Sequence, residues 1–222
     1  DQKKQIEYEQ QRSEELLRNI LPAAVAQELK DKGYVQPRHF EQVTVLFADF
    51  KDFSKICRVL SPEQLIRDLN HCFGQFDNII TRLGLERVKT IGDSYMCVSG
   101  IPEYHPAHAV RMVQAAFAMQ AFLAKWRHER EQQGLPQFHA RIGIHTGPVV
   151  AGIVGTTKFA FDIWGETVNI AARMEAAGKI DQVNISGSTH ALVGEHFTCE
   201  YRGKIPVKNI GEVEMYFVLP SK

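Results

Sequence analysis

The chain has 222 residues, enough for one well-packed domain with a small appendage. Its 26 basic and 26 acidic residues balance, which argues against a nucleic-acid partner. No run of about 18 apolar residues occurs, so we expect no membrane span, and no signal peptide is visible. The nine histidines lack paired ligand spacing, which argues against zinc. Because the four cysteines have no CxxC spacing, they indicate buried thiols in a reducing compartment; they are Cys57, Cys72, Cys97 and Cys199.

Residues 1–40 are predicted to form a helical linker, and the absence of a first Met suggests a fragment of a longer protein. Residues 1–20 are highly charged. Their main apolar side chains have only loosely heptad spacing; they are Ile6, Leu16, Leu17 and Ile20. This pattern fits a short coiled coil that joins two protomers and relays a signal, or else a solvated helix. Pro22 ends that helix or begins a second one over residues 23–32, which closes at Gly33.

A carboxylate follows the first strand. Residues 43–48 are β-branched, apolar or small, which predicts a strand buried on both faces. Burying Asp49 at the end of such a strand is costly unless something pairs with it. The loop over residues 50–54 offers backbone N–H groups to an anion. Asp49 is therefore either a metal ligand beside a phosphate site or a cap for the helix or turn that follows.

A second acid favours the metal-ligand interpretation. Residues 88–98 predict a strand, a tight glycine turn with Asp93, and another strand. Two acids at separate strand ends are what a two-metal phosphoryl-transfer site requires. Mg²⁺ and Mn²⁺ prefer such oxygen ligands, shared with substrate phosphates.

The rest of the chain alternates helices and strands, which favours an α/β or α+β sandwich with helices on a mixed sheet. Asn169 and Arg173 are four residues apart and share one helix face. No GxxxxGK(S/T) or strand-GxGxxG-helix unit occurs, which excludes Walker and Rossmann nucleotide sites.

Two long helices are expected: one capped by Ser61 with Pro62 in its first turn, ending near residue 83, and one from Pro106 past Trp126 with a solvated end at 127–133. Strands 137–146 and 149–154 should be joined by a turn at Gly147-Pro148. The remaining expected elements are a short strand from Phe159, a helix over 165–178, and strands near 197–202 and 213–219 around Lys208.

Four segments in this order resemble the class III nucleotidyl cyclase catalytic domain: FADFKDFS at 47–54, KTIGDSYM at 89–96, RIGIHTG at 141–147 and DIWGETVNIAAR at 162–173. The resemblance assigns residues 41–222 to that domain, and NILP at 19–22 resembles the linker that precedes it. It implies a ferredoxin-like βαββαβ core whose mixed, mainly antiparallel sheet is flanked by helices.

The resemblance also implies a head-to-tail dimer with active sites at its interface. Asp49 and Asp93, helped by the backbone carbonyl of Phe50, would bind two Mg²⁺ or Mn²⁺ ions per site. Further roles implied are transition-state stabilisation by Arg173, ribose positioning by Asn169, and substrate or phosphate binding by Lys208, Arg141, Phe53 and Ser54.

Each of these residues also has a purely structural alternative. Arg173 could pair with Glu166 or Glu175 on its own helix, Asn169 could cap a neighbouring loop, and Lys208 could be solvated surface.

The base-binding pair favours adenine. Lys89 can only donate a hydrogen bond and ionised Asp162 can only accept one, which matches adenine N1 and its 6-amino group. Family guanylyl enzymes have Glu and Cys at these two places. The expected reaction is therefore ATP to 3′,5′-cyclic AMP and pyrophosphate. A structural ion pair between Lys89 and Asp162 in the empty site is compatible with this, and the alternatives are a guanylyl or dual-specificity cyclase and a weakly active nucleotide-binding regulatory module.

Because this chain carries both halves of the site, it predicts an active homodimer with two equivalent sites. We also expect a cytoplasmic catalytic domain that is the output of an upstream sensor domain. One departure from the family is Asp52, where many relatives have Gly: its carboxylate either weakens phosphate binding or points to solvent.

Overall fold

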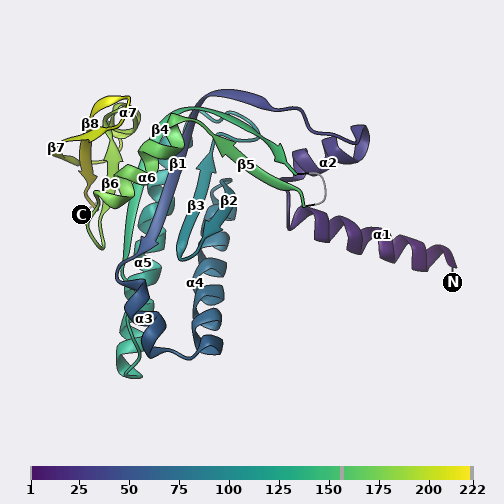
Figure 1. Ribbon diagram of the computed structural model, residues 1–222, viewed down its shortest axis with the longest axis horizontal. Coiled ribbons are helices and arrows are strands. Elements are labelled where there is room, and N and C mark those ends of the chain that lie inside the picture. The colour runs from purple at the N-terminus through teal and green to yellow at the C-terminus, as the bar shows by residue number, and fades with distance from the viewer. Residues whose placement is uncertain (1, 156–157, 221–222) are drawn as a thin grey trace.

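The computed structural model describes residues 2–155 and 158–220 (Figure 1). Within these residues the elements are α1 (Gln2–Arg18), α2 (Ala23–Lys32), β1 (Arg38–Phe50), α3 (Phe53–Val59), α4 (Pro62–Arg82), β2 (Glu86–Ile91), β3 (Ser94–Ser99), α5 (His108–Gln132), β4 (Ala140–Val154), β5 (Ala160–Trp164), α6 (Glu166–Ala176), β6 (Val183–Ser186), α7 (Gly187–Val193), β7 (Cys199–Val207) and β8 (Gly211–Val218). No helix in the described part of the chain is long and apolar enough to span a membrane.

The strands form one mixed sheet in the order β2-β3-β1-β4-β6-β8-β7, with β5 paired to β4 beside this path. Among the strand pairs that the structure describes, only β4–β6 is parallel. The predicted mainly antiparallel sheet flanked by helices is confirmed. The central strand β1 is buried from Val43 to Ala48, as its composition predicts, although it begins earlier, at Arg38.

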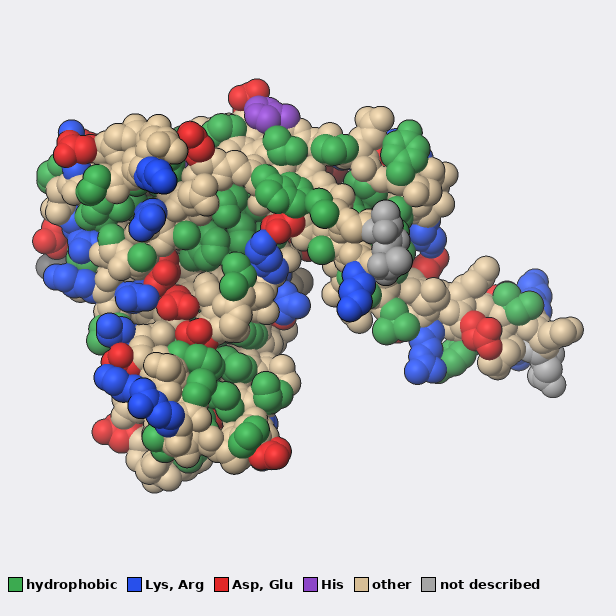
Figure 2. Space-filling view, viewed as in Figure 1, with side chains coloured by type: hydrophobic (Ala, Val, Ile, Leu, Met, Phe, Trp, Pro, Cys, Tyr) green, Lys and Arg blue, Asp and Glu red, His purple; other side chains and the backbone are tan. Residues whose placement is uncertain are grey.

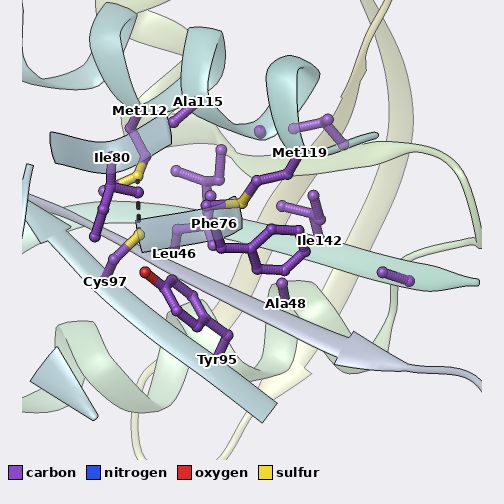
Figure 3. Close-up of a cluster of buried hydrophobic side chains, with 14 of the residues drawn as sticks. Leu46, Ala48, Phe76, Ile80, Tyr95, Cys97, Met112, Ala115, Met119 and Ile142 are labelled. Atoms are coloured by element: carbon purple, nitrogen blue, oxygen red, sulfur yellow. Dashed lines mark hydrogen bonds between the residues drawn. The ribbon is translucent and has the colours of Figure 1, made fainter. Parts of the chain in front are cut away.

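The larger core lies between the sheet and helices α4 and α5, which cover the same face (Figures 1 and 3). Phe76 of α4 and Tyr95 of β3 meet edge to face with ring centroids 5.3 Å apart, and the Tyr95 hydroxyl donates to Asp77 at 2.7 Å. Burying each large side chain here contributes about 2 kcal/mol. This core fixes the strands that carry the candidate acids.

The opposite face of the sheet is covered by α6 and by the segment around α2. Leu21 and Ala26 are 3% exposed and belong to the same apolar cluster as Val45. The linker therefore docks on the sheet, whereas α1 has no buried residue and projects away from it (Figure 1). Figure 2 shows acidic and basic side chains interspersed on the visible face, in keeping with a formal net charge of zero.

A chain of buried polar side chains crosses this fold and joins α5, β1, β4, α7 and β6. In order, the members are His108, Thr44, Thr146, Thr189, Ser186 and His145. The side-chain contacts between neighbours in this order measure 2.7, 2.9, 3.0, 3.3 and 2.7 Å. We call this set the hydroxyl chain. It satisfies polar groups that would otherwise be buried without partners.

The predicted turn at Gly147-Pro148 is wrong, because β4 runs unbroken from Ala140 to Val154. The pairing with β1 shifts register between Phe40 and Val43, opposite Val149 and Gly147. Pro148 therefore lies at a β-bulge, one of the few sheet positions where a residue without an N–H is tolerated.

Other predictions need smaller corrections. Helix α5 begins at His108 instead of Pro106, and the solvated end expected for residues 127–133 contains Arg130, which is 3% exposed. Cys57 is exposed on α3 and is therefore not a buried thiol. The predicted Ser61 cap is confirmed, since its hydroxyl accepts from the Gln64 N–H at 3.2 Å. Gly33 closes α2 with φ 76°, as expected.

Candidate active site

Asp49 and Asp93 lie at the same end of the β1–β3 pair. Asp49 is the last residue but one of β1, Asp93 lies in the turn before β3, and Ala48 pairs with Tyr95 in the antiparallel register. Burial raises the pKa of both carboxyl groups, and the negative charge of Asp49 raises the pKa of Asp93 further. Two carboxylates that repel each other in a half-buried place favour a cation between them.

The donor chemistry here fits a hard divalent cation that shares its coordination with phosphates. In the described residues, no cluster of three or more His, Cys, Asp or Glu side chains is arranged around a possible metal position. Asp49, Asp93 and a neighbouring backbone carbonyl would supply only part of a coordination shell, and Mg²⁺ commonly completes such a shell with water and substrate oxygens.

Arg141 lies beside these acids on β4, directly opposite Asp49 in the β1–β4 register. Its Nη2 is 3.3 Å from Asp49 Oδ2, and its Nε donates to Glu175 Oε1 at 2.8 Å. The guanidinium is thus shared between a strand carboxylate and a helix carboxylate. Burial raises the pKa of Glu175 while the charge of Arg141 opposes that rise.

Lys89 of β2 and Asp162 of β5 form an ion pair, so the predicted structural pairing occurs. The other oxygen of Asp162 accepts from the Ile163 N–H at 2.9 Å, which orients the carboxylate. The Lys89 side chain is 41% exposed, and that of Asp162 is 18% exposed. One donor and one oriented acceptor are therefore held side by side at an accessible place.

Asn169, Arg173 and Lys208 line one pocket with a volume of about 570 Å³. Asn169 and Arg173 come from one face of α6, as their spacing predicts, and Lys208 follows β7. Within the part of the chain that the structure describes, none of the three has a side-chain ion pair or hydrogen bond. In particular Glu175 pairs with Arg141 instead of Arg173.

Phe53 and Ser54 begin α3. The Phe53 ring is partly buried and stacks against Phe50 with centroids 6.3 Å apart. Asp52 precedes them with φ 56°, a left-handed conformation that glycine adopts without strain. Its half-exposed carboxylate pairs with Lys55 Nζ at 3.2 Å. Of the two expectations for Asp52, the structure shows the solvent-facing one.

The structure thus places the candidates in three groups: the acids with Arg141, the Lys89–Asp162 pair, and the pocket at α6. That pocket includes neither Asp49 nor Asp93. Sequence reasoning treated Glu175 only as a possible partner of Arg173. Its contact with Arg141 spans 34 positions, and no local spacing signals such a pair.

A family profile described as the adenylate and guanylate cyclase catalytic domain matches residues 35–220. The chain is 35% identical over 218 residues to an adenylate cyclase of Mycobacterium tuberculosis, covering 98% of this chain and 48% of that protein. It is also 35% identical over 219 residues to the soluble guanylate cyclase gcy-34 of Caenorhabditis elegans, covering 98% and 31%. The crystal structure of the adenylyl cyclase CyaB from P. aeruginosa matches with a TM-score of 0.80 and 28% identity, over 85% of this chain and 98% of that one.

The chain therefore belongs to the family of adenylate and guanylate cyclase catalytic domains. It spans about half the length, or less, of the curated relatives named here. Because the relatives include enzymes of both names, family membership defines a nucleotide cyclase domain without defining its base.

Proposed function

We propose that this chain is the catalytic domain of an adenylyl cyclase, which converts ATP to 3′,5′-cyclic AMP and pyrophosphate. The observation that supports it most is the ion pair of Lys89 and Asp162. Adenine needs a donor for N1 and an acceptor for its 6-amino group, and this pair offers both. Guanine held in the same position would set its N1–H donor against Lys89 and its O6 acceptor against Asp162, a strong basis for discrimination.

The acids define where the triphosphate binds. Divalent ions held by Asp49, Asp93 and the Phe50 carbonyl would lower the pKa of the 3′-hydroxyl and neutralise the leaving pyrophosphate. Arg141 lies next to this position and donates to phosphate oxygens, together with Lys208 and the backbone at Phe53 and Ser54.

Helix α6 supplies the remaining groups. Asn169 positions the ribose, and Arg173 directs its guanidinium at the charge that develops on the α-phosphate during ring closure. Because neither side chain has a partner among the described residues, both remain available to a nucleotide.

The active form is a homodimer with two sites at its interface. In one chain the acids and the Arg173 pocket are separate groups. A head-to-tail partner brings the acids of one protomer to the pocket of the other. Since this chain carries every group, the symmetric arrangement yields two complete sites.

The docked linker suggests how activity is controlled. Leu21 and the neighbouring helix α2 pack on the sheet, while α1 presents Ile6 and Leu16 to solvent. We propose that α1 of two protomers pair as a coiled coil and transmit the state of an upstream sensor to a cytoplasmic catalytic domain.

Turnover of purified protein with Mn²⁺, offered ATP and GTP separately, tests the function. Cyclic AMP as the main product supports it. Cyclic GMP as the main product would overturn the interpretation of the base pocket while keeping the enzyme class. A guanylyl cyclase is the second candidate function, because the relatives include guanylate cyclases. Nucleotide binding without either product would indicate a regulatory module, whose output Asp49→Ala would leave unchanged.

A further inference from the structure

We infer that Glu175 is a positioning residue that holds the Arg141 guanidinium away from Asp49, so that this carboxylate stays available to a divalent cation. The inference rests on the proposed function, because it takes Asp49 as a metal ligand. Glu175 itself touches neither metal nor nucleotide in this scheme and acts through Arg141.

The contact geometry supports an unequal sharing of Arg141. Its Nε contact with Glu175 is 2.8 Å, a well-formed charge-assisted hydrogen bond, whereas Nη2 lies 3.3 Å from Asp49. Among the described residues, only these two carboxylates form ion pairs with Arg141. A guanidinium that bonded Asp49 fully would compete with a cation for the same oxygens.

Close packing fixes Glu175 in place. A Cβ added at Gly143 of β4 would lie 1.9 Å from the Glu175 backbone nitrogen, so α6 rests directly on the strand here. Gly143 is two residues from Arg141 on β4. The same short segment of β4 therefore carries Arg141 and packs against the backbone of Glu175. The Glu175 side chain is 12% exposed. The close approach therefore fixes the backbone position from which the Glu175 side chain reaches Arg141.

Removing the charge of Glu175 therefore has a defined consequence. In Glu175→Gln the amide oxygen can still accept from Nε, so the shape is kept, but Asp49 becomes the only anionic partner of Arg141. The guanidinium then moves toward Asp49 and must be displaced before a cation binds. Side chains that orient a ligand typically affect metal affinity by about 10- to 100-fold when replaced.

Mn²⁺ binding tests this without turnover. Free Mn²⁺ is measured by electron paramagnetic resonance in the presence of 3′-deoxy-ATP, which lacks the nucleophilic hydroxyl. We expect Glu175→Gln to raise the half-saturating Mn²⁺ concentration about tenfold or more. The matched control is Glu28→Gln, since the Glu28 side chain is similarly buried, at 8% exposed, and pairs with Arg38 at 2.6 Å. The control should leave Mn²⁺ binding unchanged.

A double-mutant cycle with Arg141→Gln separates positioning from a direct electrostatic effect. If Glu175 acts through Arg141, Glu175→Gln has no further effect on Mn²⁺ affinity in the Arg141→Gln background. The inference is overturned if Glu175→Gln leaves the affinity unchanged, if Glu28→Gln weakens it equally, or if the loss persists without Arg141. Wild-type protein that binds Mn²⁺ yet forms no cyclic nucleotide would reject the proposed function alone.

Discussion

Lys89 and Asp162 neutralise each other in the nucleotide-free chain, and adenine would replace each partner with a complementary atom. Both side chains would therefore have a hydrogen-bond partner before and after binding. This matters most for Asp162, whose side chain is only 18% exposed, because an unpaired carboxylate that is largely buried would destabilise the free protein. The choice of base then depends on which purine can form hydrogen bonds with both side chains in place of their mutual ion pair.

Exchanging this pair should exchange the base. We expect Lys89→Glu combined with Asp162→Cys to change the ratio of kcat/KM for ATP over GTP by about 100-fold or more, because guanine then finds an acceptor for its N1–H. Steady-state kinetics with both nucleotides measures the ratio. The surface variant Lys204→Glu should retain the wild-type ratio. An unchanged preference in the double variant would show that other residues select the base.

His145 should make stability depend on pH. Burial lowers its pKa from 6.5 to about 4. Between these values the unfolded chain binds a proton that the folded chain does not, so stability is complete above about pH 6.5 and falls toward pH 4. The loss amounts to about 3 kcal/mol. Urea unfolding at pH 7.5, 6 and 5 measures it, and His145→Asn should show a shallower dependence. Equal slopes in both proteins would contradict this.

At the scale of the elements, local signals predicted the longer helices, whereas the short helices α3 and α7 were not predicted. The capping pattern of Ser61 and Pro62 and the stop at Gly33 are chemical signals that a sequence carries directly. Strand β6 and helix α7 were missed, since a four-residue strand buried on both faces has no visible period. The bulge at Pro148 depends on what β1 does across the sheet, which no local window contains.

The contact between α4 and α5 is another feature that no local window of the sequence predicts. Arg130 looked like part of a solvated helix end, yet its Nη1 lies 2.8 Å from Asp68 of α4 and its Nε donates to the Pro136 carbonyl at 2.6 Å. The guanidinium also lies over the Trp126 ring, 4.8 Å from its centroid. The buried ion pair of Arg130 and Asp68 thus links α5 to α4.

Breaking that pair should be costly, whereas replacing it entirely should not be. We expect Arg130→Met to lower the free energy of unfolding by about 3–5 kcal/mol, because Asp68 is left as an uncompensated buried charge. Adding Asp68→Leu should restore most of the loss. Chemical denaturation of both variants provides the measurement. A double variant as unstable as the single one would show that packing of the guanidinium, and not charge, holds the helices.

At the scale of the whole molecule, the candidate site is divided. Sequence reasoning named the acids, the base pair and the α6 residues because each belongs to a short motif. The contact between Glu175 and Arg141 could not be predicted in this way, because it forms only when α6 lies on β4. In the proposed homodimer a second chain brings the three groups together, and the fold of one domain contains no signal of that assembly.

A divided site predicts complementation. Asp49→Ala and Arg173→Ala should each be inactive alone, because each removes a group needed in both sites of a homodimer. Mixed in equal amounts, they form heterodimers in which one site has lost both groups and the other is intact. Random pairing should restore about one quarter of the wild-type activity. Turnover of the mixture measures this, and persistent inactivity of exchanged subunits would contradict an interfacial site.

The hydroxyl chain has a further consequence that appears when its protons are counted. Five contacts link His108 to His145, and each needs one proton. The four hydroxyl groups between them supply four, so one imidazole must donate through Nδ1 and the other must accept there. The two histidines therefore hold opposite tautomers, although they lie on different elements. If the accepting imidazole is protonated, its Nδ1 becomes a donor as well. The hydroxyl chain then has one proton too many, and one of its five hydrogen bonds must be lost.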